Sequence, residues 1–251
     1  MMGGRLLLLP SLVAGSTVDD VLPGRVLEIA RSTRHFLAED AKSARGFLKA
    51  IGHPVAIQEI DIVEIGHEPD AARIDRWLQP LRGGLDLALV SEAGCPAVAD
   101  PGATIVARAH ELGFTVHPLV GPSSLLLALM GSGLEGQRFR FVGYLPRAES
   151  ECAAAIKALE AASRAGETQL FIETPYRNER LFAALLHHCA RETRLSVAVG
   201  LTGPAEAIAT RTIGSWCKLS AGQLPALRNR PAVFALLAPQ GTRVTKSRPA
   251  P

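Results

Sequence analysis

Cysteine is scarce in this sequence, and its spacing argues against a metal centre. The four cysteines are Cys95, Cys152, Cys189 and Cys217, and no two of them form a CxxC pair. Zinc sites bring such ligands together at short, regular spacings. Wide, irregular spacing in a chain of 251 residues also favours reduced thiols over a disulfide framework. We therefore expect a cytoplasmic protein that binds no metal.

Long apolar runs are missing as well. No segment approaches the roughly 18 consecutive apolar residues of a membrane-spanning helix, so no association with a membrane is expected. The N-terminal run from Leu6 to Leu9 is short and ends at Pro10. We interpret it as a buried first strand rather than a signal peptide.

Several motifs of common enzyme classes are absent. The sequence has no GxGxxG and no GxxxxGK[ST], which bind dinucleotides and nucleotide phosphates. It also lacks the GxSxG of serine hydrolases and the HExxH of zinc proteases. The chemistry is therefore expected to need neither a metal nor a covalent nucleophile.

What the sequence does contain is alternation between short apolar runs and helical patterns. Apolar residues make up 47% of the chain, which is sufficient for a packed core. The run at 85–90 is nearly all apolar, as in a central parallel strand, and 55–65 alternates as a strand does. This order predicts the α/β fold class, with a mostly parallel sheet in the first half and a more mixed sheet in the second.

The pattern divides into two α/β domains. We place the N-terminal domain at 1–120 and the C-terminal domain at 121–240, followed by a basic, turn-rich tail at 241–251 that is expected to be disordered. The net charge of +3 is too small to indicate a nucleic-acid partner by itself.

Four turn-rich loops follow predicted strands. They read VSEAGCPAVADPG at 90–102, VGPSS at 120–124, GYLP at 143–146 and ETPYR at 173–177. In open α/β sheets ligands bind where strands end, and glycine there lets the backbone approach a ligand closely. Any one loop of this composition is ordinary, but four of them together indicate a binding site.

These motifs, in this order, resemble those of the tetrapyrrole methylase superfamily. The most similar branch is that of ribosomal RNA small-subunit methyltransferase I, which carries AEDTR, VSDAGTPLINDPG, PGPSA, RFxFxGFLP and an E-[ST]-P-H-R-like segment. The corresponding segments here are AED at 38–40 with SAR at 43–45, the loops at 90–102 and 120–124, RFRFVGYLP at 138–146, and ETPYR. The resemblance spans about residues 5 to 238.

The resemblance implies two α/β domains with the ligand cleft between them, S-adenosylmethionine (SAM) as methyl donor, and a homodimer. Matching the motifs residue by residue gives a set of expected donor contacts. They are Pro10, Gly94, Cys95, Val98, Ser123, Ser124, Ile172, Leu201 and Ala232. The last three rest on strand position and not on a motif.

The sequence departs from that branch where the substrate would be handled. The branch has a first loop like PTPIGNL and a segment RELTK, whereas this chain has PSLVAGS at 10–16 and VGLTG at 199–203. These departures affect the assignment of the substrate more than that of the donor.

The favoured function is SAM-dependent methylation of RNA, of the type that modifies a ribose 2′-hydroxyl of small-subunit rRNA. A hydroxyl acceptor benefits from a general base, for which the loop acids Glu39, Asp40 and Glu173 are candidates, although each is equally suited to cap a helix or hold an arginine such as Arg177. A basic stripe of Arg31, Arg34, Lys42, Arg45 and Lys49 is a candidate RNA contact or simply a solvated helix face. The alternatives are a methylase of a tetrapyrrole or other small molecule, and a non-catalytic SAM-binding protein.

Overall fold

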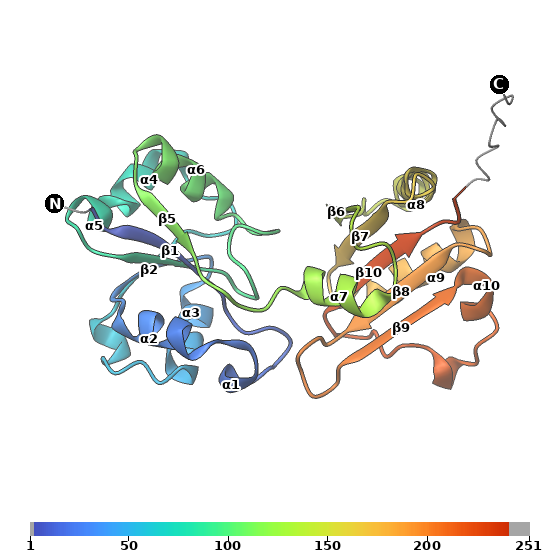
Figure 1. Cartoon of the computed structure of the whole chain (residues 1–251), viewed down its shortest axis with the longest axis horizontal. Coiled ribbons are helices and arrows are strands. Elements are labelled where there is room, and N and C mark those ends of the chain that lie inside the picture. The colour runs from blue at the N-terminus through green and yellow to red at the C-terminus, as the bar shows by residue number, and fades with distance from the viewer. Residues whose placement is uncertain (1–2, 241–251) are drawn as a thin grey trace, which may run out of the picture. The chain divides into compact units, whose positions relative to one another are not determined.

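The computed structural model describes residues 3–240, which form two compact units with one β-sheet each (Figure 1). The first unit contains residues 3–124 and Thr202–Pro204, and the second contains Leu125–Leu201 and residues 205–240. The predicted α/β class is confirmed. The tail predicted at 241–251 lies outside the described residues.

The sheet of the first unit has five strands in the order β3-β2-β4-β1-β5, and every neighbouring pair is parallel. The strands are β1 (Arg5–Leu9), β2 (His35–Ala38), β3 (Asp61–Glu64), β4 (Leu87–Val90) and β5 (Thr115–Pro118). The helices are α1 (Val18–Val21), α2 (Gly24–Ser32), α3 (Ala41–Ala50), α4 (Ala71–Trp77), α5 (Gln79–Arg82) and α6 (Ala103–Glu111), with a 3₁₀ turn at Ile57–Glu59. A parallel sheet places the ends of all its strands at one edge, here called the carboxyl edge.

Alternate side chains of these strands enter two separate apolar clusters. Leu7 and Val90 pack with α2 and α3, whereas Leu6 and Leu89 pack with α4, α5 and α6. Because successive side chains of a strand point to opposite faces, a strand covered on both faces must be apolar throughout. β4 is buried along its whole length, and all four of its residues are accordingly apolar.

The strand predicted over 55–65 is mostly wrong. Only Asp61–Glu64 is a strand, and Ile57–Glu59 forms the 3₁₀ turn. β3 is one of the two edge strands of the sheet, and its burial is partial. An edge strand pairs with a neighbour on one side only, so no second neighbour is present to extend β3 over the whole range of 55–65.

The sheet of the second unit is mixed, as the sequence predicts, in the order β6-β7-β10-β8-β9. Its strands are β6 (Phe139–Tyr144), β7 (Thr168–Glu173), β8 (Arg194–Val199), β9 (Ala207–Thr212) and β10 (Ala232–Leu237). Only β6 and β7 run parallel, and the other pairs are antiparallel. The helices are α7 (Ser124–Ser132), α8 (Glu149–Ser163), α9 (Asn178–His188) and α10 (Ile213–Trp216), with a 3₁₀ turn at Ala221–Gln223.

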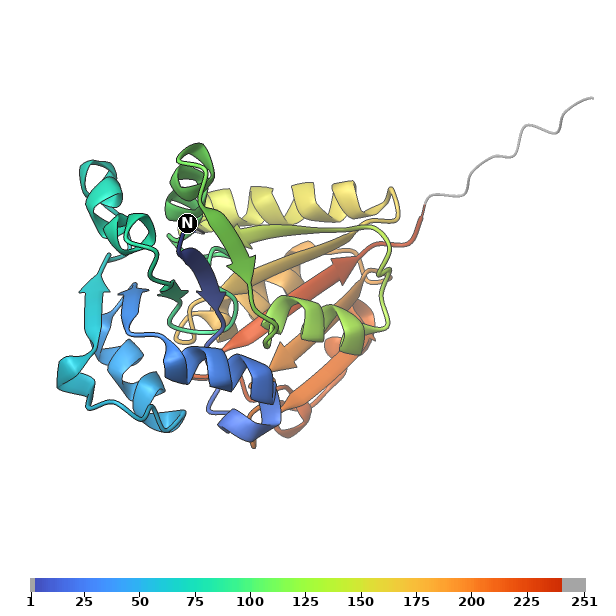
Figure 2. The same ribbon diagram turned by 60° about the vertical axis from the view of Figure 1, so that its left-hand side comes forward.

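The two faces of this sheet also have separate cores. Phe171 and Phe234 stack with ring centroids 5.7 Å apart, in the cluster that includes residues of α8, α9 and α10. Figure 2 shows α8 running alongside this sheet, where it packs against β7 and β10. Leu170 and Val233 face the other way and pack against α7.

Within the described range, no helix combines the length and apolar character of a membrane-crossing segment. In the same part of the chain, no group of three or more His, Cys, Asp or Glu side chains is arranged to hold a metal ion. The four cysteines are free thiols.

Candidate functional site

The loop after β4 has an unusual backbone. Gly94 has φ +73°, and two alanines, Ala97 and Ala99, also have positive φ, at 65° and 57°. Positive φ is unfavourable for a residue with a Cβ, so other interactions must hold the loop in this form. Asp100 supplies them, because its Oδ1 accepts hydrogen bonds from the N–H of Ala97 at 2.9 Å and of Gly102 at 2.6 Å.

The carbonyl of Gly94 joins this loop to the loop after β1. It accepts a hydrogen bond from the N–H of Ser11 at 2.9 Å and another from the hydroxyl of Ser91 at 2.9 Å. Gly94 is also close to the loop after β5, since a Cβ on it would lie 3.2 Å from the carbonyl oxygen of Pro122. The same oxygen accepts from the thiol of Cys95 at 3.4 Å.

Gly121 completes the junction of the three loops. A Cβ built on Gly121 would stand 2.3 Å from the Cβ of Pro10 and 2.6 Å from its Cγ. The backbone after β5 therefore lies directly on the proline ring that follows β1. β1 lies between β4 and the outermost strand β5, so the three loops meet at the β5 side of the carboxyl edge.

Six of the nine predicted donor contacts lie in these three loops. Pro10 and Gly94 are buried, Cys95, Ser123 and Ser124 are half-buried, and Val98 is exposed. The thiol pKa of Cys95 is raised by burial. The first unit thus gathers at one edge the residues that the sequence motifs single out.

The other three predicted contacts lie in the second unit and do not share one face of its sheet. Ile172 and Leu201 belong to the cluster under α7. Ala232 is the cross-strand partner of Glu173 and Val199, and its side chain belongs to the cluster on the opposite face. Since side chains on one strand alternate, strand position alone does not predict this difference.

Ser11 is a residue that the motif comparison misses. Its side chain is buried, and its hydroxyl has no hydrogen-bond partner within the described part of the chain. A buried polar atom without a partner is uncommon and costly in a folded protein. Because Ser11 also contacts the Gly94 carbonyl through its N–H, this orphaned hydroxyl lies at the loop junction.

These features fit a polar ligand such as SAM. Gly94 and Gly121 let the three loops come together without a side chain between them, and Ser11 offers a buried hydroxyl without a hydrogen-bond partner among the described residues. Ligand sites in proteins are commonly apolar with a few placed polar groups. Pro10, Gly94, Cys95 and Ser11 are the residues of this edge that would hold the donor.

Two of the three candidate bases have structural partners. Asp40 caps α3, and donation from the N–H of Ser43, at 2.6 Å, lowers the pKa of this carboxyl group. Glu173 is almost completely buried, forms an ion pair with Arg177 at 2.9 Å, and accepts from the N–H of Thr174 at 2.7 Å. Both carboxylates therefore have the structural roles that the sequence offered as alternatives to catalysis, since Asp40 caps a helix and Glu173 holds an arginine.

Glu39 has a different partner, His67. Glu39 follows β2 and His67 follows β3, and the Nδ1 of His67 hydrogen-bonds to a carboxylate oxygen of Glu39. Burial raises the pKa of Glu39, the hydrogen bond to His67 partly offsets this, and the charges of Glu92 and Asp100 raise the pKa further. The hydrogen bond to Glu39 raises the pKa of His67. This pair therefore lies within electrostatic range of the loop after β4.

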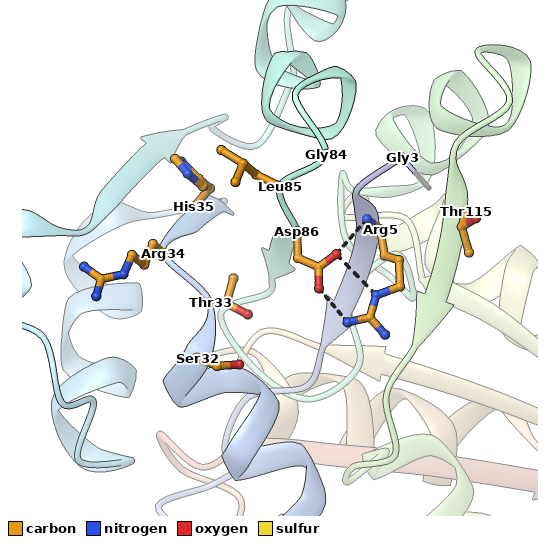
Figure 3. A pocket seen from close by; sticks show the side chains of 10 residues that line it. All are labelled: Gly3, Arg5, Ser32, Thr33, Arg34, His35, Gly84, Leu85, Asp86 and Thr115. Carbon is orange, nitrogen blue, oxygen red and sulfur yellow. Dashed lines mark hydrogen bonds and ion pairs between the residues drawn. The ribbon is translucent and has the colours of Figure 1, made fainter. Parts of the chain in front are cut away.

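A cavity of about 740 Å³ in the first unit lies at the opposite edge of the sheet, where the strands begin (Figure 3). Its central side chains are Arg5 and Asp86, which bridge the start of β1 and the residue before β4. This ion pair satisfies both groups, and the pKa of Asp86 is lowered by the hydrogen bond from Arg5. None of the predicted donor contacts lines this cavity.

Proteins with similar sequences identify the family of this chain. The family model described as "Tetrapyrrole (Corrin/Porphyrin) Methylases" matches residues 18–216. A "Ribosomal RNA small subunit methyltransferase I" of Micromonospora olivasterospora is 35% identical over 184 residues, which are 72% of this chain and 55% of that protein. The protein of the same name from Neisseria meningitidis serogroup B is 31% identical over 214 residues, 85% of this chain and 69% of that protein. The match with the Micromonospora protein thus spans about half of that relative's length.

Solved structures show the same fold. Uroporphyrin-III-C-methyltransferase from Thermus thermophilus matches with a TM-score of 0.53 at 18% identity, over 93% of this chain and 94% of that one. A diphthine synthase matches with a TM-score of 0.60 at 16% identity, over 93% and 89%. At such identities the likeness concerns the fold alone. The family model, which covers most of the sequence, carries the conclusion that this chain belongs to the tetrapyrrole methylase family.

Proposed function

We propose that this protein is a SAM-dependent methyltransferase that acts on RNA and modifies a ribose 2′-hydroxyl of small-subunit ribosomal RNA. The observation that carries the proposal is the junction of three loops at the carboxyl edge of the first sheet, built around the Gly94 carbonyl. The names of the relatives from Micromonospora and Neisseria support RNA as the substrate.

The proposed donor contacts are the nine residues expected from the sequence, together with Ser11. Pro10 and Gly121 fix the spacing of two loops, Gly94 brings backbone to the ligand, and Ser11 donates a hydrogen bond to it. When bound, SAM would supply a methyl group activated by its positive sulfur. The protein has to align the acceptor with it and exclude water.

We also propose the Glu39–His67 pair as the acceptor of the hydroxyl proton. Glu39 holds Nδ1 of the imidazole, which leaves Nε2 to take the proton as the oxygen gains the methyl group. Asp40 and Glu173 are less suited, because each is already engaged as a cap or in a buried ion pair. Glu39 is thus a positioning residue in this scheme.

The test of the function uses the purified protein with S-adenosylhomocysteine, the product of methyl transfer, and then with SAM and undermethylated small ribosomal subunits. We expect saturable micromolar binding by calorimetry and transfer of label from SAM to ribose in the RNA. Binding followed by transfer to a tetrapyrrole instead would support the small-molecule alternative. Binding without transfer to either acceptor would support the non-catalytic alternative, and no binding would contradict the donor assignment.

A substitution at Ser11 tests the donor site, because stability and ligand affinity should change in opposite directions. We expect Ser11→Ala to raise the free energy of unfolding by about 1 kcal/mol, because it removes a buried hydroxyl without a partner. The same change should weaken S-adenosylhomocysteine binding about tenfold. Chemical denaturation and calorimetry measure the two effects.

Ser91→Ala is the matched control. Its hydroxyl is also buried but donates to the Gly94 carbonyl, so its removal should destabilise the protein by about 1 kcal/mol. If Ser11→Ala lowers stability and leaves the affinity unchanged, the hydroxyl does not serve the donor.

We further propose that the protein is a cytoplasmic homodimer. Leu126 and Met130 on α7 are 50% and 78% exposed, and α7 is apolar on all sides. A second copy would cover this face.

A further inference from the structure

The second unit contains a groove along one side of α9, with a volume of about 280 Å³. Arg177, Arg180, Leu181, Ala184, His187 and His188 recur at helical spacing along it. The opposite wall comes from the segment after β6, with Pro146 and Arg147, and from the first turn of α8, with Glu149 and Cys152.

The cationic groups of this groove exceed its acids. Glu173 is matched by Arg177, and Arg180 lies 3.5 Å from Glu149, whose side chain is 88% exposed. Exposed pairs of the latter kind contribute little and are easily exchanged. Arg147 is exposed and forms no ion pair within residues 3–240. Two guanidinium groups are therefore available to an anion.

The residues between the charged groups are small. Ala183 and Ala184 lie between Arg180 and the two histidines, whose rings contact each other edge to face. Arg180 and His187 are seven residues apart, which corresponds to about 10 Å along a helix. The groove is thus elongated, with cationic side chains near one end and imidazoles at the other.

We propose that this groove binds the phosphate backbone of single-stranded RNA, with Arg147 and Arg180 as the phosphate contacts. The inference rests on the proposed function and deepens it by naming where the second unit holds the acceptor strand. Arginine suits the task because its planar fork matches phosphate oxygens. Small side chains on the floor let the backbone of a strand lie close to the helix.

The first test measures affinity for a short single-stranded RNA of mixed sequence by fluorescence anisotropy at several salt concentrations. We expect the double variant Arg147→Ala, Arg180→Ala to bind about tenfold more weakly, with the salt slope reduced by about 1.4, since each phosphate contact on a single strand contributes about 0.7. Binding of S-adenosylhomocysteine should not change.

The control is Arg164→Ala, Arg228→Ala, which removes two exposed arginines of the same unit that do not line the groove. It should leave affinity and slope unchanged. If wild-type protein binds RNA and the groove variant binds equally well, the groove assignment is wrong while the proposed function stands. If wild-type protein binds no RNA, the proposed substrate class falls and the groove assignment with it.

Cys152 gives a second readout that needs no substitution. It lines the groove and is half-buried, whereas Cys217 is exposed and lies elsewhere in the same unit. Burial raises the pKa of the Cys152 thiol, so alkylation by N-ethylmaleimide is followed at mildly alkaline pH by mass spectrometry of peptides. RNA should slow alkylation of Cys152 and not of Cys217. Equal rates with and without bound RNA would place the strand outside the groove.

Discussion

Gly121→Val should strongly weaken donor binding and destabilise the fold of the first unit. A Cβ at this position would lie 2.3 Å from the Cβ of Pro10, and the proline ring cannot turn away as a flexible side chain would. The two loops must separate, and overpacking of this kind costs about 1–3 kcal/mol. Loop displacement at a ligand site should lower affinity for S-adenosylhomocysteine about 100-fold, or about 2.8 kcal/mol.

Gly46→Ala is the control for the change of a glycine. Gly46 is exposed in the middle of α3, and a Cβ there would meet no atom within 4 Å. We expect this variant to gain about 0.5–1 kcal/mol of stability with unchanged affinity. Denaturant unfolding measures the stability of both variants, and calorimetry measures their affinity for S-adenosylhomocysteine. A folded Gly121→Val protein with wild-type affinity would show that the contact with Pro10 does not shape the donor site.

The general plan of the fold could be predicted from periodicity. The nearly all-apolar run that contains β4 indicated a central strand, and such strands need helices on both faces. The prediction failed at 55–65, where alternation continued but the position at the sheet edge limited the strand to four residues. Position in the sheet is a tertiary property that local alternation does not encode.

Roles of single residues were harder to predict than loops. The sequence could not decide whether Asp40 caps a helix or acts on substrate, and its bond to the N–H of Ser43 now shows the cap. It gave no signal for His67, because its partner Glu39 is 28 residues away and meets it only when β2 and β3 pair. Ser11 was missed for the same reason, since its burial depends on the loop after β4.

The positive φ of Ala97 and Ala99 could not be predicted from the residue types at these positions. A turn of this kind usually selects glycine or asparagine, and the sequence places neither at those two positions. Asp100 compensates by accepting from two N–H groups of the loop. Strained backbone held by a dedicated side chain is common at ligand sites, which supports the assignment of this loop to the donor.

Methyl transfer should require His67 and should accelerate as the pH rises. The hydrogen bond to Glu39 raises the pKa of His67 above 6.5, and only the neutral imidazole can accept a proton. The fraction of active enzyme therefore increases through the raised pKa, so the single-turnover rate should climb with pH above 6.5 and then level off. His67→Gln should lower the rate about 100-fold and remove this dependence, because it removes a general base.

Two further variants separate proton transfer from a structural role of the pair. Glu39→Gln removes the charge that raises the pKa of His67, so the rise in rate should move to lower pH. His117→Gln changes another exposed histidine of the same unit, on β5, and should alter neither rate nor profile. Binding of S-adenosylhomocysteine should stay unchanged in all three variants, since none of these residues belongs to the loop junction. If His67→Gln keeps both the wild-type rate and its pH profile, the hydroxyl loses its proton to another group or to water.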